Sequence, residues 1–131
     1  MKHFILLISI CLAMTVALTS ATAGYAEATF QETAHDFGVI KEAKGPVSHT
    51  FKFTNTGTTP LVIVQATASC GCTRPEYPTK PIKPGKSGNV KVTFNPAGRP
   101  GAFKKLVKIK TNGREHRSTL VITGTVTPGK K

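Results

Sequence analysis

The chain has 131 residues, of which 18 are Lys or Arg and only 6 are Asp or Glu, so its net charge is +12. This length suits one domain with one core, and the charge favours solubility and attraction to anionic surfaces. Because there is no Trp and there are only two Tyr, few side chains could stack on bases, and we expect no nucleic-acid recognition.

The first 23 residues have the pattern of a cleavable export signal. Lys2 gives a basic start, residues 4–18 are almost wholly apolar, and Ala21-Thr22-Ala23 offers the small side chains that signal peptidase requires. The apolar run is shorter than the roughly 20 residues needed to span a bilayer. We expect cleavage between Ala23 and Gly24, with Ala26-Glu27-Ala28 as the second choice. The mature chain would then carry a charge of +11, have no transmembrane anchor and be periplasmic or extracellular.

The rest of the chain alternates between turn residues and short runs rich in Val, Ile, Thr and Phe. This pattern is typical of an all-β protein. We predict a short lead at residues 24–28 and an immunoglobulin-like β-sandwich of about seven antiparallel strands over residues 29–127. A flexible basic tail is expected at residues 128–131.

The first strands are expected as follows. Residues 29–40 form one strand that is broken near Ala34. Residues 47–54 alternate between apolar and polar side chains, which is typical of a strand with one wet face. Residues 61–68 are apolar until Gln65, so we expect this strand to be covered on both faces.

The later strands alternate more regularly. Residues 90–95 alternate, and residues 103–110 place lysines on one face and apolar side chains on the other. Leu106 interrupts that order and predicts a bulge. Residues 120–126 follow a hairpin turn at Asn112-Gly113. The predicted core comprises Phe37, Ile40, Phe51, Phe53, Leu61, Ile63, Ile82, Val90, Val92, Phe94, Phe103, Val107, Ile109, Leu120, Ile122 and Val126.

Two turns have a specific expected geometry. Asn55-Thr56-Gly57 is expected to use glycine for a positive φ. Lys83-Pro84-Gly85 fits a type II turn, with Pro at the second position and Gly at the third.

The mature chain would keep only two of the three cysteines, Cys70 and Cys72, since Cys11 leaves with the signal. Three interpretations stay open. The pair can close a local disulfide that is strained and therefore labile toward other thiols, although the usual Cys-x-x-Cys redox motif is absent. It can contribute to a soft copper or zinc site, for which nothing in the sequence places His35, His49 or His116 beside it. It can also simply fix a turn, with Gly71 letting the backbone bend.

No motif for a nucleophile, a phosphate loop or paired catalytic carboxylates is present, so we predict no enzymatic activity, no catalytic residue and no cofactor. Basic side chains fall on wet strand faces and in the last turn. They can form a patch for an anionic partner or a solvated face that discourages edge pairing. This predicted basic patch comprises Lys52, Lys91, Lys104, Lys108, Lys110, Arg114 and Arg117.

Several segments together form a recognisable set. They are His35-Asp36-Phe37-Gly38-Val39-Ile40, His49-Thr50-Phe51-Lys52-Phe53-Thr54-Asn55-Thr56-Gly57, Pro60-Leu61-Val62-Ile63, Ala68-Ser69-Cys70-Gly71-Cys72-Thr73, Ile82-Lys83-Pro84-Gly85-Lys86-Ser87-Gly88, Gly98-Arg99-Pro100-Gly101 and Val121-Ile122-Thr123-Gly124. This set resembles one exported bacterial family, that of the domain of unknown function 1573. The resemblance implies an immunoglobulin-type domain similar to the Hydin-like folds and no established activity. Together with the residues it predicts a non-enzymatic binding or scaffolding module of the bacterial envelope. Its partner would be another envelope protein or an anionic envelope surface. The alternative is a metal-binding or thiol-redox protein that uses Cys70 and Cys72.

Overall fold

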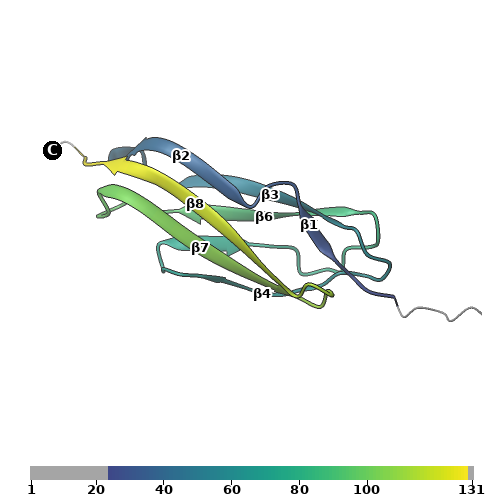
Figure 1. Cartoon of the computed structure of the whole chain (residues 1–131). Coiled ribbons are helices and arrows are strands. Elements are labelled where there is room, and N and C mark those ends of the chain that lie inside the picture. Colours follow the sequence, from purple (N-terminus) through teal and green to yellow (C-terminus); the bar gives the residue numbers. More distant parts are fainter. Residues whose placement is uncertain (1–23, 130–131) are drawn as a thin grey trace, which may run out of the picture.

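The computed structural model describes residues 24–129, which form a sandwich of two four-stranded sheets (Figure 1). Sheet A contains, in spatial order, β1 (Ala28–Phe30), β3 (Val47–Asn55), β6 (Ser87–Phe94) and β5 (Thr73–Glu76). Sheet B contains β2 (Ala34–Lys41), β8 (Arg117–Thr127), β7 (Gly101–Thr111) and β4 (Ile63–Ala68). A single 3₁₀ turn, η2 (Glu42–Lys44), connects β2 to β3. The predicted all-β, immunoglobulin-like sandwich is confirmed.

The predicted export signal, residues 1–23, and the last two residues of the predicted tail lie outside the described residues. Of the tail, Pro128 and Gly129 are described, and the Gly129 N–H donates to Glu42 Oε1 at 2.9 Å. Within residues 24–129 no helix is long and apolar enough to cross a membrane.

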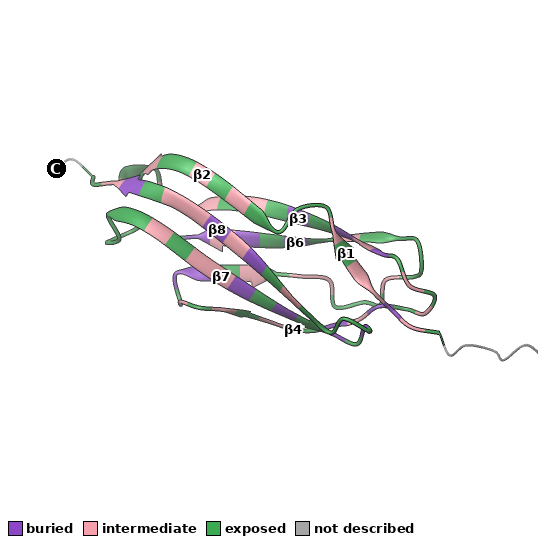
Figure 2. Ribbon diagram, viewed as in Figure 1, coloured by how far each residue is buried: buried purple, intermediate pink, exposed green. Residues whose placement is uncertain are grey.

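Apolar and polar side chains alternate along the strands, so the apolar ones lie buried between the two sheets and the polar ones lie on the two solvent-exposed outer faces. On β3, Phe51 and Phe53 point inward and are fully buried, while Lys52 between them is exposed. On β6, Val90 and Val92 do the same on either side of exposed Lys91. Figure 2 shows this alternation of buried and exposed positions along β7 and β8. The period of two in the sequence therefore decides which side chains form the core.

Twelve of the predicted core residues are buried in the core cluster, and the other four, Phe37, Ile40, Ile82 and Phe103, pack against it while partly exposed. The twelve are Phe51, Phe53, Leu61, Ile63, Val90, Val92, Phe94, Val107, Ile109, Leu120, Ile122 and Val126. Ala26 and Cys72 also belong to the core, and the sequence pattern did not indicate either of them.

The break predicted near Ala34 sends the chain from one sheet to the other. β1 pairs with β3 in sheet A, and β2 pairs with β8 in sheet B. Contrary to the prediction of antiparallel strands throughout, β2 runs parallel to β8. The β2–β8 register shifts between Asp36 and Val39, where Gly38 has a φ of 69°.

Two finer predictions about the strands were wrong. β7 pairs with β8 without a register shift from Gly101 to Lys110, so there is no bulge at Leu106, which simply points to the outer face. The strand over residues 61–68 is not covered on both faces, since Val64 is 55% exposed. Residues 73–76 form β5, so residues 24–129 contain eight strands where about seven were expected.

The two turn predictions had different outcomes. Gly85 has a φ of 79°, and the Lys86 N–H donates to the Lys83 carbonyl at 3.0 Å, as the predicted type II turn requires. Gly57, by contrast, is not among the residues with positive φ. A Cβ on Gly57 would lie 2.7 Å from Ala26 Cα and 2.8 Å from the Glu27 nitrogen. Gly57 is needed for this close approach of two backbone segments.

Candidate functional site

Cys70 and Cys72 form a disulfide in the turn between β4 and β5, with their Cα atoms 5.2 Å apart. Cys72 is buried, and its carbonyl accepts the Asn95 N–H at 2.8 Å, while Cys70 is half-buried. Gly71 has no positive φ, and a Cβ added to it would meet nothing within 4 Å. Because the two sulfurs are bonded to each other, neither is present as a thiolate that could bind copper or zinc.

The predicted basic patch is divided between opposite faces of the sandwich. Lys52 and Lys91 lie on the outer face of sheet A, where Lys91 pairs in register with Glu76 of β5. The other strand lysines, Lys104, Lys108 and Lys110, lie on the outer face of sheet B. The sequence could assign each lysine to a wet face but could not say which sheet carried it.

Part of the predicted patch gathers in a shallow hollow on sheet B, which we call the basic depression. Its volume is about 420 Å³. Its lining residues are Gln65, Thr67, Lys108, Ile109, Lys110, Arg117, Ser118 and Thr119. Lys110 and Arg117 are cross-strand neighbours, as are Lys108 and Thr119. Among the described residues, none that lines the depression is acidic. It thus combines three cations with amide and hydroxyl groups.

Arg114, which was predicted to belong to the same patch, has other contacts. Its guanidinium lies 3.5 Å from Glu27 Oε1 and 4.0 Å from the centre of the Tyr25 ring. These contacts attach the β7–β8 turn to the lead segment before β1. Arg114 therefore holds two segments of the fold together and does not line the basic depression.

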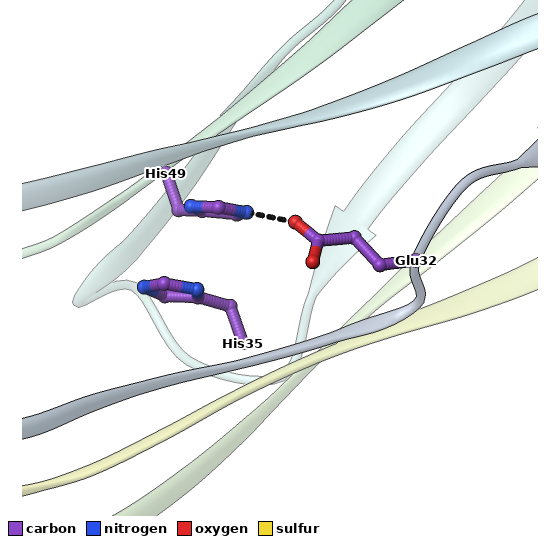
Figure 3. Close-up of side chains that lie close together, drawn as sticks. All are labelled: Glu32, His35 and His49. Atoms are coloured by element: carbon purple, nitrogen blue, oxygen red, sulfur yellow. Dashed lines mark hydrogen bonds and ion pairs between the residues drawn. The ribbon is translucent and has the colours of Figure 1, made fainter.

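A cluster that the sequence pattern did not reveal lies at the β2/β3 edge of the sandwich (Figure 3). His35 of β2 and His49 of β3 stack face to face, with ring centroids 3.6 Å apart. Glu32, from the connection between β1 and β2, forms a hydrogen-bonded ion pair with His49. We call these three residues the His–Glu cluster. His116 is exposed in the β7–β8 turn and is not part of it.

The sequence indicates the inward position of the two histidines but not that they meet. His49 shares the inward parity of Phe51, and His35 lies two residues before Phe37, so both histidines continue rows of core residues. Each ring contacts the phenylalanine two positions later in an edge-to-face arrangement. The ring centroids are 4.7 Å apart for His35 and Phe37 and 4.8 Å apart for His49 and Phe51. The sequence could not show that these rows meet, because β2 and β3 belong to different sheets.

Solved structures with a similar fold come from distant proteins. A protein of unknown function from Porphyromonas gingivalis W83 is 20% identical with a TM-score of 0.65, and the match covers 84% of this chain and 50% of that one. The ASH/PapD-like domain 7 of human CEP192 is 11% identical with a TM-score of 0.66, covering 87% and 93%. The VesB protease of Vibrio cholerae is 17% identical with a TM-score of 0.61, covering 76% and 31%.

These likenesses establish the fold. The chain spans half the length of the Porphyromonas structure and about a third of the protease, so these two matches each concern one part of a longer protein. Among curated proteins, none matches this chain. The family model for the protein of unknown function DUF1573 matches residues 28–126, almost all of the described sandwich, and the chain belongs to this family.

Proposed function

We propose that this protein is an exported, non-enzymatic module of the bacterial envelope that binds an anionic membrane surface through the outer face of sheet B. The basic depression carries the proposal, because Lys108, Lys110 and Arg117 gather there without an acidic neighbour in the lining. Cations concentrated on one face attract phosphate groups, and guanidinium and ammonium groups donate charge-assisted hydrogen bonds to them.

Two features of the face support a surface as the partner. The depression is shallow and lies on paired strands, so it offers a broad contact and not an enclosed site for a small molecule. Lys104 lies further along the same face of β7 and extends the positive charge beyond the depression. Each Lys or Arg near an anionic membrane contributes about 1 kcal/mol to binding.

The experiment measures sedimentation of the purified protein with vesicles of phosphatidylcholine, with and without phosphatidylglycerol. The test variant is Lys108→Gln/Lys110→Gln/Arg117→Gln. Its matched control is Lys52→Gln/Arg74→Gln/Lys91→Gln, which removes three charges from sheet A. We expect binding only to the anionic vesicles, and the sheet B variant to bind roughly a hundredfold more weakly.

The outcomes distinguish a site from a general charge effect. The sheet A control is expected to bind within about threefold of the unchanged protein, since its lysines face away from the contact. Equal weakening in both variants would show that net charge alone causes the binding. Binding that is insensitive to salt would also contradict the proposal, because exposed charges are screened by ions.

The alternative function, metal or thiol chemistry at Cys70 and Cys72, has less support. The sulfurs are bonded to each other, and Cys72 is only 7% exposed. Thiol titration of the protein before and after incubation with glutathione would test it. Rapid exchange with glutathione under native conditions would favour a redox role, and an intact bridge would favour a structural one.

A further inference from the structure

The His–Glu cluster brings three potential metal ligands together from three segments of the chain. The ligand atoms of Glu32, His35 and His49 all lie within 4.8 Å of one another. His35 comes from sheet B, His49 from sheet A, and Glu32 from the connection that joins the sheets. In Figure 3 the Glu32 carboxylate points toward the two stacked rings.

The ligand types match those of a divalent transition metal. Two imidazoles and one carboxylate form an established ligand set for zinc, with a fourth position left for water, and the same set also suits copper or iron. Zn–N bonds of about 2.0–2.1 Å in a tetrahedron place two ligating nitrogens about 3.3 Å apart. The ring centroids are 3.6 Å apart, so the two imidazoles are close enough for their nitrogens to reach that spacing. Because each lone pair lies in its ring plane and the planes are 7° from parallel, the rings would have to rotate toward each other to bind one ion.

The ring nitrogens are available for such a role. His35 and His49 together have four ring nitrogens. Within residues 24–129 only one of these, His49 Nε2, has a protein hydrogen-bond partner, which is the Glu32 carboxylate. The cluster is also accessible to an ion from solvent, since the side chains of His49 and Glu32 are 23% and 46% exposed. Phe37 and Phe51 pack edge to face against the rings and keep the two imidazoles beside each other. The ligands are therefore held close to one another before an ion arrives.

We propose that Glu32, His35 and His49 bind one divalent transition-metal ion, with zinc as the expected ion. The bound ion would bridge sheet A and sheet B at the open edge where β2 faces β3. This site is separate from the basic depression and from Cys70 and Cys72. It would stabilise the sandwich, because an ion that binds only the folded state lowers the free energy of that state.

Calorimetric titration with ZnCl₂, on chelator-treated protein without a histidine tag, tests the proposal. We expect one zinc ion per chain and a zinc-dependent rise in the melting temperature. His49→Gln is expected to weaken zinc binding at least tenfold and to abolish the rise. Its matched control, His116→Gln, removes an exposed histidine outside the cluster and is expected to leave both unchanged.

Two further variants keep the test decisive. Glu32→Gln changes an exposed side chain outside the strands, so it tests the site even if His49→Gln fails to fold. It is also expected to weaken zinc binding at least tenfold. Cys70→Ser/Cys72→Ser is expected to retain zinc binding. Loss of zinc binding in this variant would show that the cysteines, and not the His–Glu cluster, hold the ion. No zinc binding, or equal binding by all variants, would overturn the proposal.

Discussion

Two polar clusters on the inward-facing row of β3 use their hydrogen-bonding groups in opposite ways. Asn55, the last residue of β3, is fully buried, and both its amide oxygen and its amide nitrogen are occupied by protein partners. His49, near the start of the strand, is half-buried, has a single carboxylate partner and stacks on the ring of His35. A saturated polar group holds the fold together, whereas a group with unused ligand atoms can bind something else.

Asn55 connects three segments: the lead before β1, the loop after β3 and the loop before β6. Its Oδ1 accepts the N–H groups of Gly57 at 2.9 Å and Glu27 at 3.3 Å. Its Nδ2 donates to the carbonyls of Thr59 at 2.8 Å and Ile82 at 2.9 Å. Without Asn55 the Gly57 and Glu27 N–H groups and the Thr59 carbonyl would lose these partners, whereas the Ile82 carbonyl also accepts the Leu61 N–H at 2.8 Å.

The largest effect is expected from Asn55→Ala. The change removes four hydrogen bonds and leaves part-buried backbone groups unpaired, so the free energy of unfolding should fall by about 3 kcal/mol. Urea denaturation measures this. Asn89→Ala, on the exposed face of β6, is the matched control and should cost within about 0.5 kcal/mol. A similar loss in both variants would mean that Asn55 does not have the structural role assigned to it.

The next largest effect is expected from Gly57→Ala, at the same end of β3. The new methyl group would overlap the backbone of Ala26 and Glu27, so the lead segment must move away from the turn. Overpacking of this kind costs about 2 kcal/mol. Thermal or urea unfolding would measure the loss.

Gly71→Ala is the matched control for Gly57→Ala. A methyl group at Gly71 meets open space, and the backbone there has no positive φ. We expect a change within about 0.5 kcal/mol and normal formation of the Cys70–Cys72 bridge, checked by mass spectrometry. A large loss of stability would restore the expectation from the sequence that Gly71 is required for the bend.

The sequence predicted the fold well, because alternation and turn residues are local signals. Most of the buried core positions follow directly from a period of two, and Pro84-Gly85 determines its turn by its own backbone preferences. The parallel pairing of β2 with β8 could not be predicted, since it depends on where the chain crosses between sheets. β5 was missed for a different, local reason: its four residues include Pro75 and have little alternation of their own.

The candidate sites depend on that crossing and were predicted less well. Local patterns identified the cysteine pair and the lysines of β7, since each set lies within one segment. The His–Glu cluster needs residues from two sheets and their connection, and no spacing in the sequence indicates that they meet. Lys52 and Lys91 show the converse error, because a shared polar character was taken to mean a shared face.

A smaller effect is expected from His49→Leu, which tests whether the His–Glu cluster contributes to stability as Asn55 does. An apolar side chain can fill the same inward position beside Phe51, and Glu32, which is 46% exposed, can turn to water. Stability in the absence of metal should therefore change by less than about 1 kcal/mol, far less than in Asn55→Ala. Urea denaturation in the presence of a chelator measures it. A loss of about 3 kcal/mol would show that the His–Glu cluster is structural in the same sense as Asn55.

The smallest effect is expected at Glu42 in η2, whose carboxylate combines the full hydrogen bonding of Asn55 with the exposure of the His–Glu cluster. It is close to solvent, yet its two oxygens accept the N–H groups of Gly98 at 2.6 Å and Gly129 at 2.9 Å. Hydrogen bonds from Gly129 and then Gly98 lower the pKa of Glu42 below its ordinary value of 4.5. A lowered pKa in the folded state means that the charged form stabilises the protein above the unfolded pKa. That contribution is lost as the pH falls through the folded value.

Glu42→Gln should therefore lower the melting temperature slightly at pH 7, since the neutral amide has one oxygen to accept two N–H groups. The difference from the unchanged protein should shrink as the pH falls below 4.5, where the native carboxyl group also becomes protonated. Melting curves at several pH values measure this, with Glu115→Gln in the exposed β7–β8 turn as the control for removing one acidic residue. A difference that stays constant down to low pH would mean that the charge of Glu42 contributes nothing. The carboxylate would then resemble the His–Glu cluster, whose polar groups we expect the fold not to require, more than it resembles Asn55.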